Sequence, residues 1–370
     1  MLLTCTRWFA PMLATLHGLA SVAVAAGESL PPTRLPRTNL MMFRSASGAV
    51  APVKTIADWQ RRRAEILEGM QQVMGPLPGR EKRCPLEPAV IEEDDCGDYV
   101  RRRVTYSAEP GARVPAYLLV PKKALVSGVS YPAVLALHQT HPAGQKVVVG
   151  LGKSPDDEYG VALVKRGFVV LAPPYTMLAE YWPDVKSLGY ASGTMKSIWD
   201  NIRGLDYLET LPFVQTNGFG AIGHSLGGHN GIFTAAFDVR IRVVVSSCGL
   251  DSFVDYYGGD PGVWKPERGW CQERYMPRLL GFAGKLDGLP FDFAEIIGAI
   301  APRTCFISAP LGDSNFKWRS VEAIGRSAQP VYNLLGEREN LQVTHPDCGH
   351  LFPAEVREQA YRLIEKVLGR

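Results

Sequence analysis

Short apolar runs alternate with amphipathic stretches along most of this chain. Nearly continuous apolar runs, typical of parallel strands buried on both faces, lie at residues 132–137, 168–172, 219–222, 241–246 and 304–308. Apolar residues at helical spacing lie at residues 156–166, 194–208, 228–237 and 354–368. Two segments before these, 99–107 and 114–120, predict an antiparallel pair. The pattern predicts an α/β fold, a mostly parallel sheet of about eight strands with helices on both faces.

Two regions lie outside this alternation. Residues 58–74 have the spacing of an amphipathic helix that packs on the main domain, and we expect the arginines at 61–63 to form its solvated face. Residues 250–298, between two predicted core strands, are rich in aromatic residues, glycine and proline. An insertion at this place predicts a cap over one edge of the sheet.

A serine stands at a sharp turn between a strand and a helix. The sequence Gly223-His224-Ser225-Leu226-Gly227 directly follows the apolar run at 218–222 and precedes the helical pattern at 228–237. This is the context of a nucleophile elbow, in which glycines avoid a collision of β-carbons where strand and helix nearly touch. We predict Ser225 to be a nucleophile.

A serine hydroxyl needs a base and an orienting acid. His350 lies in a glycine-containing loop before the last helical pattern, and Asp313 follows the apolar run at 304–308. The chain order serine, aspartate, histidine is that of the α/β-hydrolases. We therefore predict a triad of Ser225, His350 and Asp313.

Each partner has an alternative. Asp313 could instead be a turn or helix-capping residue, and Asp251, after the run at 241–246, is a rival acid. His345 competes with His350, although we expect it to end a strand. His224 and His229 flank the serine but stand on the wrong elements to be its base, so we expect them to be packing or helix-start residues.

A tetrahedral oxyanion needs two backbone donors. The elbow supplies the N–H of Leu226, and we assign the second to the N–H of Gln139, in the loop after residues 132–137. His138 resembles the histidine that opens the oxyanion loop of many esterases. We expect it to brace this loop, with substrate contact as a lesser alternative.

The aromatic residues of the cap have two interpretations. Trp264 and Trp270 could line a sugar-stacking or acyl-binding surface, or they could form the cap's own small core.

The first residues and the cysteines bear on the cellular compartment in which the protein works. A single positive charge, an apolar stretch and Ala23-Val24-Ala25 predict a signal peptide over residues 1–26, hence a secreted or periplasmic protein. Six cysteines would remain: Cys84, Cys96, Cys248, Cys271, Cys305 and Cys348. The pairs to test first are Cys84 with Cys96 and Cys248 with Cys348, but scattered thiols fit equally well.

Charge and histidine spacing exclude other classes of function. A net charge of +3 is too small to indicate nucleic acid or an anionic membrane as a partner. The histidines form no H-E-x-x-H, so we expect neither a metal nor another cofactor. The oligomeric state stays open.

Several motifs together resemble one family. Residues 192–201, 223–230, 246–249 and 346–350 are similar to the secreted α/β-hydrolases grouped with dienelactone hydrolases and acetyl xylan esterases. Dienelactone hydrolases proper use a cysteine where this chain has Ser225, so their substrate is not carried over. Glucuronoyl esterases place an arginine close behind the serine, where this chain has Gly227, so we do not expect their activity.

The resemblance and the predicted triad imply a serine carboxylic ester hydrolase without cofactors. We expect it to remove small acyl groups, acetyl first, from carbohydrate through an acyl-enzyme. Residues 27–85 would form an N-terminal extension and 86–370 the catalytic domain with its cap. The alternatives are a peptidase of prolyl-oligopeptidase type, which would usually bring a β-propeller, and a non-catalytic binding protein on the same fold.

Overall fold

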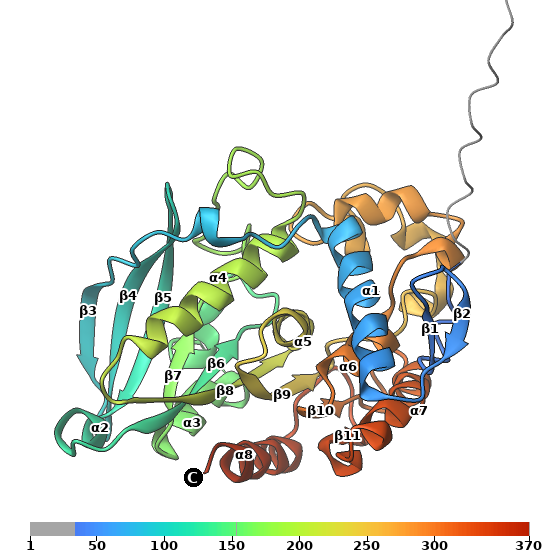
Figure 1. Ribbon diagram of the computed structural model, residues 1–370. Helices are drawn as coiled ribbons and strands as arrows, with labels where there is room; N and C mark the ends of the chain where they lie inside the picture. Colours follow the sequence, from blue (N-terminus) through green and yellow to red (C-terminus); the bar gives the residue numbers. More distant parts are fainter. Residues whose placement is uncertain (1–33, 153, 370) are drawn as a thin grey trace, which may run out of the picture. The chain divides into compact units, whose positions relative to one another are not determined.

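The computed structural model describes residues 34–152 and 154–369. A nine-stranded sheet forms its centre, in the order β11-β10-β9-β8-β6-β7-β5-β4-β3 (Figure 1). The strands are β3 (Ala89–Asp95), β4 (Tyr99–Glu109), β5 (Ala112–Pro121), β6 (Tyr131–Leu137), β7 (Val169–Ala172), β8 (Val214–His224), β9 (Ile241–Ser247), β10 (Thr304–Ser308) and β11 (Leu341–Thr344). From β11 to β7 they run parallel, and β5, β4 and β3 join by antiparallel pairing. The predicted α/β fold is confirmed.

Helices cover both faces of this sheet. They are α1 (Ile56–Met74), α2 (Lys122–Val126), α3 (Tyr159–Lys165), α4 (Gly193–Glu209), α5 (Leu226–Phe237), α6 (Phe293–Ile300), α7 (Trp318–Leu334) and α8 (Ala354–Leu368). In β6, Val134 and Ala136 pack into a core with α3 and α8, whereas Leu135 and Leu137 pack into the core that contains α4, α5 and α6. Successive side chains of a strand point to opposite faces, so the continuous apolar run predicted a strand covered on both sides.

The predicted strand number was one too low. The ninth strand, β3, carries the acidic run at residues 92–95, most of it exposed, and forms one edge of the sheet. It pairs with the arginines of β4: Arg102 donates to Glu93 at 2.6 Å, and Arg101 to Asp94 at 2.8 Å. In the sequence, a run of like charges predicts a solvated loop. In the structure, pairing with β4 holds this run as a strand. A small antiparallel hairpin of β1 (Met42–Arg44) and β2 (Val50–Pro52) was not predicted.

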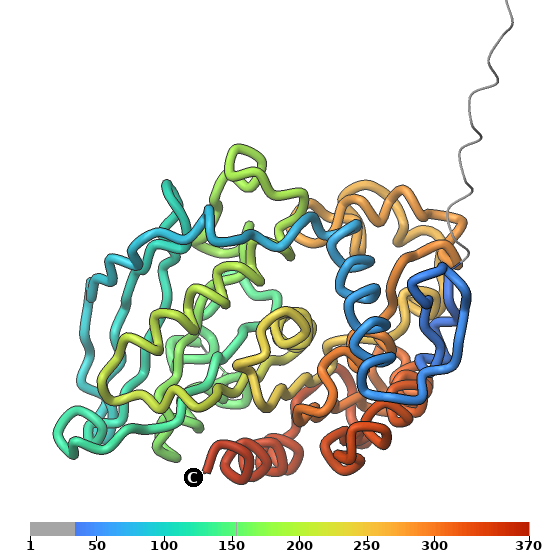
Figure 2. Tube along the Cα trace, in the orientation of Figure 1, coloured from blue at the N-terminus to red at the C-terminus, as the bar shows by residue number. Residues whose placement is uncertain are grey.

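Helix α1 is the predicted amphipathic helix, but its arginines do not all lie on a solvated face, as the sequence had suggested. Arg62 is buried and forms an ion pair with Glu295 of α6, and Arg34 reaches the same carboxylate. Arg63 donates to the carbonyls of Ala299 and Ala236. The expected solvated face is therefore wrong for two of the three arginines. Figure 2 shows the blue helix α1 beside the orange segment that contains α6.

All six cysteines of the described residues are free, so neither Cys84 with Cys96 nor Cys248 with Cys348 is a disulfide. The interpretation as scattered thiols is the one that the structure has. The predicted signal peptide lies outside the described residues. None of the described helices has the length and apolar character needed to cross a membrane.

A buried charge network ties α4 to the antiparallel strands. Lys196 of α4 has no exposed side-chain surface and forms ion pairs with Asp200, one turn along, and with Glu109 of β4 at 3.4 Å. Its ammonium also donates to the Tyr181 hydroxyl at 3.1 Å. Each charge in this network is acceptable only because the others are present.

We predict that Lys196→Met lowers the free energy of unfolding by about 3–5 kcal/mol, because it leaves the buried Asp200 carboxylate without its cation and leaves Glu109 with Lys82 alone. Lys186→Met is the matched control, since it removes a surface ion pair with Glu273. Urea denaturation of both variants measures the difference. Equal stability of the two would contradict the assignment.

Candidate active site

Ser225 stands at a strained turn between β8 and α5. Its backbone has φ 52° and ψ −118°, and its N–H donates to the Ser247 carbonyl of β9 at 2.7 Å. A β-carbon on Gly223 would lie 2.2 Å from the Gly227 carbonyl carbon, and one on Gly227 would lie 1.9 Å from the Leu137 oxygen. Both glycines are required because backbone meets backbone here. Strain of this kind persists only where the surroundings enforce it, as at functional sites.

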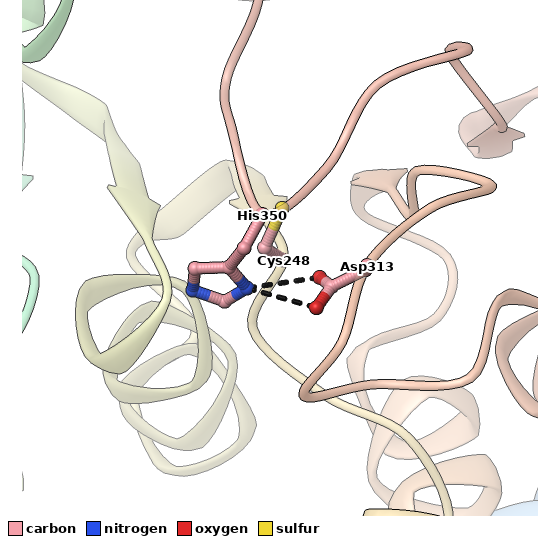
Figure 3. Close-up of side chains that lie close together, drawn as sticks. All are labelled: Cys248, Asp313 and His350. Carbon is pink, nitrogen blue, oxygen red and sulfur yellow. Dashed lines mark hydrogen bonds and ion pairs between the residues drawn. The ribbon is translucent and has the colours of Figure 1, made fainter.

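Asp313 and His350 meet at the same edge of the sheet. The His350 Nδ1 lies 3.0 Å from both carboxylate oxygens of Asp313, as Figure 3 shows. Burial works to raise the pKa of Asp313, but hydrogen bonds from His350 and from the backbone N–H groups of Asn315 and Phe316 outweigh it and hold the pKa below its usual range. The acid is thus a carboxylate that accepts Nδ1–H, which leaves the His350 Nε2 lone pair for a proton.

His350 lies beside the elbow without bonding to it. Its ring packs against His224, the residue before Ser225, with 4.9 Å between ring centroids. Among the described residues, no hydrogen bond joins the Ser225 hydroxyl to His350. In many enzymes such bonds tighten only when substrate binds.

The rival acid and base are engaged elsewhere. Asp251 accepts the backbone N–H of Lys317 at 3.0 Å, and burial raises its pKa to about 8, so it is mostly protonated at neutral pH. His345 lies at the end of β11 and uses its ring nitrogens toward the Ala309 carbonyl and Glu322. Of the weighed pairs, the structure brings together Asp313 and His350.

The backbone N–H groups of Leu226 and Gln139, the predicted oxyanion donors, have no acceptor among the described residues, and neither does that of Gly227. The contact of Gly227 with the Leu137 carbonyl draws the loop after β6 to the start of α5. His138 then braces this loop, because its Nδ1 lies 2.7 Å from the Gln139 carbonyl and its Nε2 accepts the Tyr175 N–H at 2.9 Å. Burial lowers the pKa of His138 to about 4, so the brace is neutral.

A cavity of about 170 Å³ adjoins Ser225 between the core and the cap. The core lines it with Thr140, Leu226, His229, Asn315 and Phe316, and the cap with Tyr256, Tyr257, Gly269, Trp270, Gln272 and Tyr275. A larger open groove of about 540 Å³ borders Asp313 without reaching the serine. The cavity is where a group attached to Ser225 would lie.

The cap tryptophans occupy two different places. Trp264 is 5% exposed, packs against Phe253 and does not line the cavity. Trp270 is 3% exposed and contacts the rings of several neighbours, although it also reaches the cavity. The structure thus places Trp264 in the core of the cap, not on the stacking wall that the sequence analysis considered.

His229 was missed as a cavity residue. It stands on α5 one turn after Ser225, is 3% exposed, and its ring centroid lies 4.7 Å from that of Trp270. The four-residue spacing was visible in the sequence, since residues i and i+4 share a helix face.

Cys248 lies next to the acid and the histidine (Figure 3). Its sulfur, the Asp313 carboxylate and a His350 ring nitrogen all lie within 4.8 Å of one another, a set of atoms that metals can bind. Burial, followed by the charge of Asp313, raises the pKa of the Cys248 thiol well above its usual value. Because His350 Nδ1 already binds Asp313, a metal here would have to displace that bond.

Known proteins resemble this chain in sequence and in fold. A family model described as "Glucuronyl esterase, fungi" matches residues 185–336. A glucuronoyl esterase from Solibacter usitatus superposes with a TM-score of 0.70 at 18% identity, covering 90% of this chain and 98% of that one. The chain has the α/β-hydrolase fold.

Two further proteins are similar to this chain. The Bacillus subtilis protein named "Putative hydrolase YtaP" is 25% identical over 323 residues, which cover 83% of this chain and all of that protein. A Bacteroides fragilis structure described as "a putative acetyl xylan esterase" superposes with a TM-score of 0.56 at 15% identity, covering 84% of this chain and 83% of that one.

We predict that Asp313→Asn reduces kcat about ten-thousandfold through the wrong histidine tautomer, whereas Asp251→Asn keeps most activity. Hydrolysis of an aryl acetate by both variants measures this. The opposite ranking would move the acid to the loop after β9.

The raised pKa of Asp251 predicts a pH dependence of stability. Between the unfolded pKa of about 4 and the folded pKa of about 8, the native state binds the extra proton, so this group makes stability fall as pH rises through that window. Asp251→Asn should therefore gain in Tm over the wild type at pH 8 more than at pH 5. A Tm difference that does not change with pH would show that Asp251 ionises normally.

Proposed function

We propose that the protein is a serine carboxylic ester hydrolase acting on carbohydrate esters. The observation that carries the proposal is the His350–Asp313 pair, bonded at 3.0 Å beside the strained turn of Ser225. The family model and the esterase structures support the same class of reaction.

The chemistry follows from the positions of the groups. The Ser225 hydroxyl attacks the ester carbonyl carbon while His350 Nε2 takes its proton, and the Asp313 carboxylate stabilises the imidazolium. The N–H groups of Leu226 and Gln139 donate to the oxyanion. His350 then gives the proton to the leaving alcohol, and water activated by the same nitrogen releases the acid from Ser225.

The acyl group has two candidates. Acetyl is the one that the family resemblance implies, and a neighbour described as an acetyl xylan esterase supports it. A uronoyl group was not expected from the sequence, because Gly227 stands where glucuronoyl esterases have an arginine, but the match of residues 185–336 to the glucuronyl esterase model supports it. Rates on an acetylated xylo-oligosaccharide and on methyl glucuronate, compared with an aminoacyl anilide, separate these two from each other and from a peptidase.

We also propose that the protein is exported. This proposal rests on residues 1–26 alone.

We predict that Ser225→Ala lowers kcat for ester hydrolysis at least about a thousandfold and leaves Tm nearly unchanged, because only the nucleophile is lost. Stopped assays with an aryl acetate and a melting curve measure the two effects. Retention of more than about a tenth of the activity would remove Ser225 from this role.

A further inference from the structure

Cys248 places a thiol beside the Asp313–His350 pair, and the proposed reaction does not use it. It directly follows β9, while Asp313 follows β10 and His350 follows β11, and these three strands are neighbours in the sheet. Cys248 is buried, and its φ of 49° lies in the left-handed region. A residue other than glycine holds such a φ only where its surroundings enforce it, often at a functional site.

The three side chains bring metal-binding atoms close together (Figure 3). The bond lengths of a tetrahedral Zn²⁺ with sulfur, nitrogen and oxygen ligands place the ligand atoms about 3.3–3.6 Å apart. The His350 Nδ1 and the Asp313 oxygens are 3.0 Å apart, so they need to separate only slightly. The Cys248 sulfur lies within 4.8 Å of both and needs to approach by about 1 Å at most.

The charges and hydrogen bonds around these atoms suit a divalent cation. The backbone N–H groups of Asn315 and Phe316 donate to Oδ1 of Asp313, while Oδ2 bonds to His350. Hydrogen bonds of this kind orient a carboxylate that binds a metal. The Asp313 carboxylate and a Cys248 thiolate carry two negative charges, which neutralise a doubly charged cation where burial makes an unpaired charge costly.

An open groove leads to the acid from outside the substrate cavity. The groove of about 540 Å³ includes Asp313 in its lining, and the cavity beside Ser225 shares none of its residues. The groove supplies the water molecule that completes four ligands around Zn²⁺. The Asp313 side chain is only 1% exposed, so a cation reaches its oxygens when neighbouring side chains move. Binding is therefore expected to need preincubation.

We propose that Cys248, Asp313 and His350 form a binding site for a thiophilic divalent cation, with Zn²⁺ as the probe, and that this cation inhibits the enzyme. The Cys248 thiol gives its proton to solvent when it binds the cation. The cation replaces the Nδ1 proton between His350 and Asp313, and the neutral imidazole carries its one proton on Nε2. One proton is thus released for each cation bound.

Inhibition follows from the change of tautomer. With a proton on Nε2, His350 has no lone pair there to accept the proton of the Ser225 hydroxyl. The cation also occupies the carboxylate that stabilises the imidazolium. The inhibition rests on the proposed ester hydrolysis at Ser225, whereas the binding of the cation does not.

The first test measures inhibition by Zn²⁺ after preincubation, with an aryl acetate as substrate. We expect Zn²⁺ to inhibit the wild type and a chelator to restore its activity. Cys248→Ser should keep its activity without Zn²⁺ and need about tenfold more Zn²⁺ or more for half-inhibition, because a hydroxyl is a poorer ligand for Zn²⁺ than a thiolate. Mg²⁺, which prefers six oxygen ligands, should not inhibit.

Cys348→Ser is the matched control. Cys348 lies two residues before His350 and also carries a free thiol, but it is not among the three ligand residues. We expect its half-inhibiting concentration of Zn²⁺ to equal that of the wild type. An equal effect of the two serine variants, or inhibition that Cys248→Ser does not weaken, would overturn the proposal.

A binding measurement separates this inference from the proposed function. Co²⁺ replaces Zn²⁺ as a spectroscopic probe, because a cobalt–thiolate bond absorbs in the near ultraviolet. We expect this absorption to saturate at one equivalent of Co²⁺ in the wild type and in Cys348→Ser, and to be absent in Cys248→Ser. If the wild type hydrolyses no ester but shows this pattern, the proposed reaction fails and the metal site stands. Absorption that persists in Cys248→Ser, or none in the wild type, would overturn the site whatever the rates.

Discussion

The close approach of three backbone segments at Ser225 is the constraint on which the site depends. The start of α5 lies against the Leu137 carbonyl at the end of β6, and the Ser225 N–H donates to the Ser247 carbonyl at the end of β9. With no β-carbon at Gly227, the loop after β6 can approach the elbow. These two contacts together position Ser225, the proposed nucleophile, and bring the loop that contains Gln139, a proposed oxyanion donor, to the start of α5.

Burial shifts the pKa values of the ionisable groups near this turn by different net amounts. It lowers the pKa of His138 to about 4 and raises that of Asp251 to about 8, so that both are mostly neutral at pH 7. Asp313 escapes this effect because His350 and two backbone N–H groups donate to it. The site thus keeps its negative charge on the one carboxylate that faces the histidine, where it can stabilise an imidazolium.

The sequence by itself determined the sheet, the elbow and the order of the proposed triad. Local signals are strong there: apolar runs for strands buried on both faces, glycines two residues on either side of Ser225, and polar loops where strands end. Helix α8 begins and ends where its spacing predicted. These features depend on neighbours in the chain, and a single sequence contains them.

Other features were decided only by the tertiary structure, because they depend on contacts between residues that are distant in the chain. The acidic strand β3 is extended because the arginines of β4 lie opposite it, and Arg62 is buried because Glu295, more than two hundred residues away, receives it. That Asp313, and not Asp251, bonds His350 is seen only in the fold. His229 is identified as a cavity residue only in the folded structure, where the cap covers α5. Burial and missing hydrogen-bond partners are properties of packing, and the local sequence pattern does not contain them.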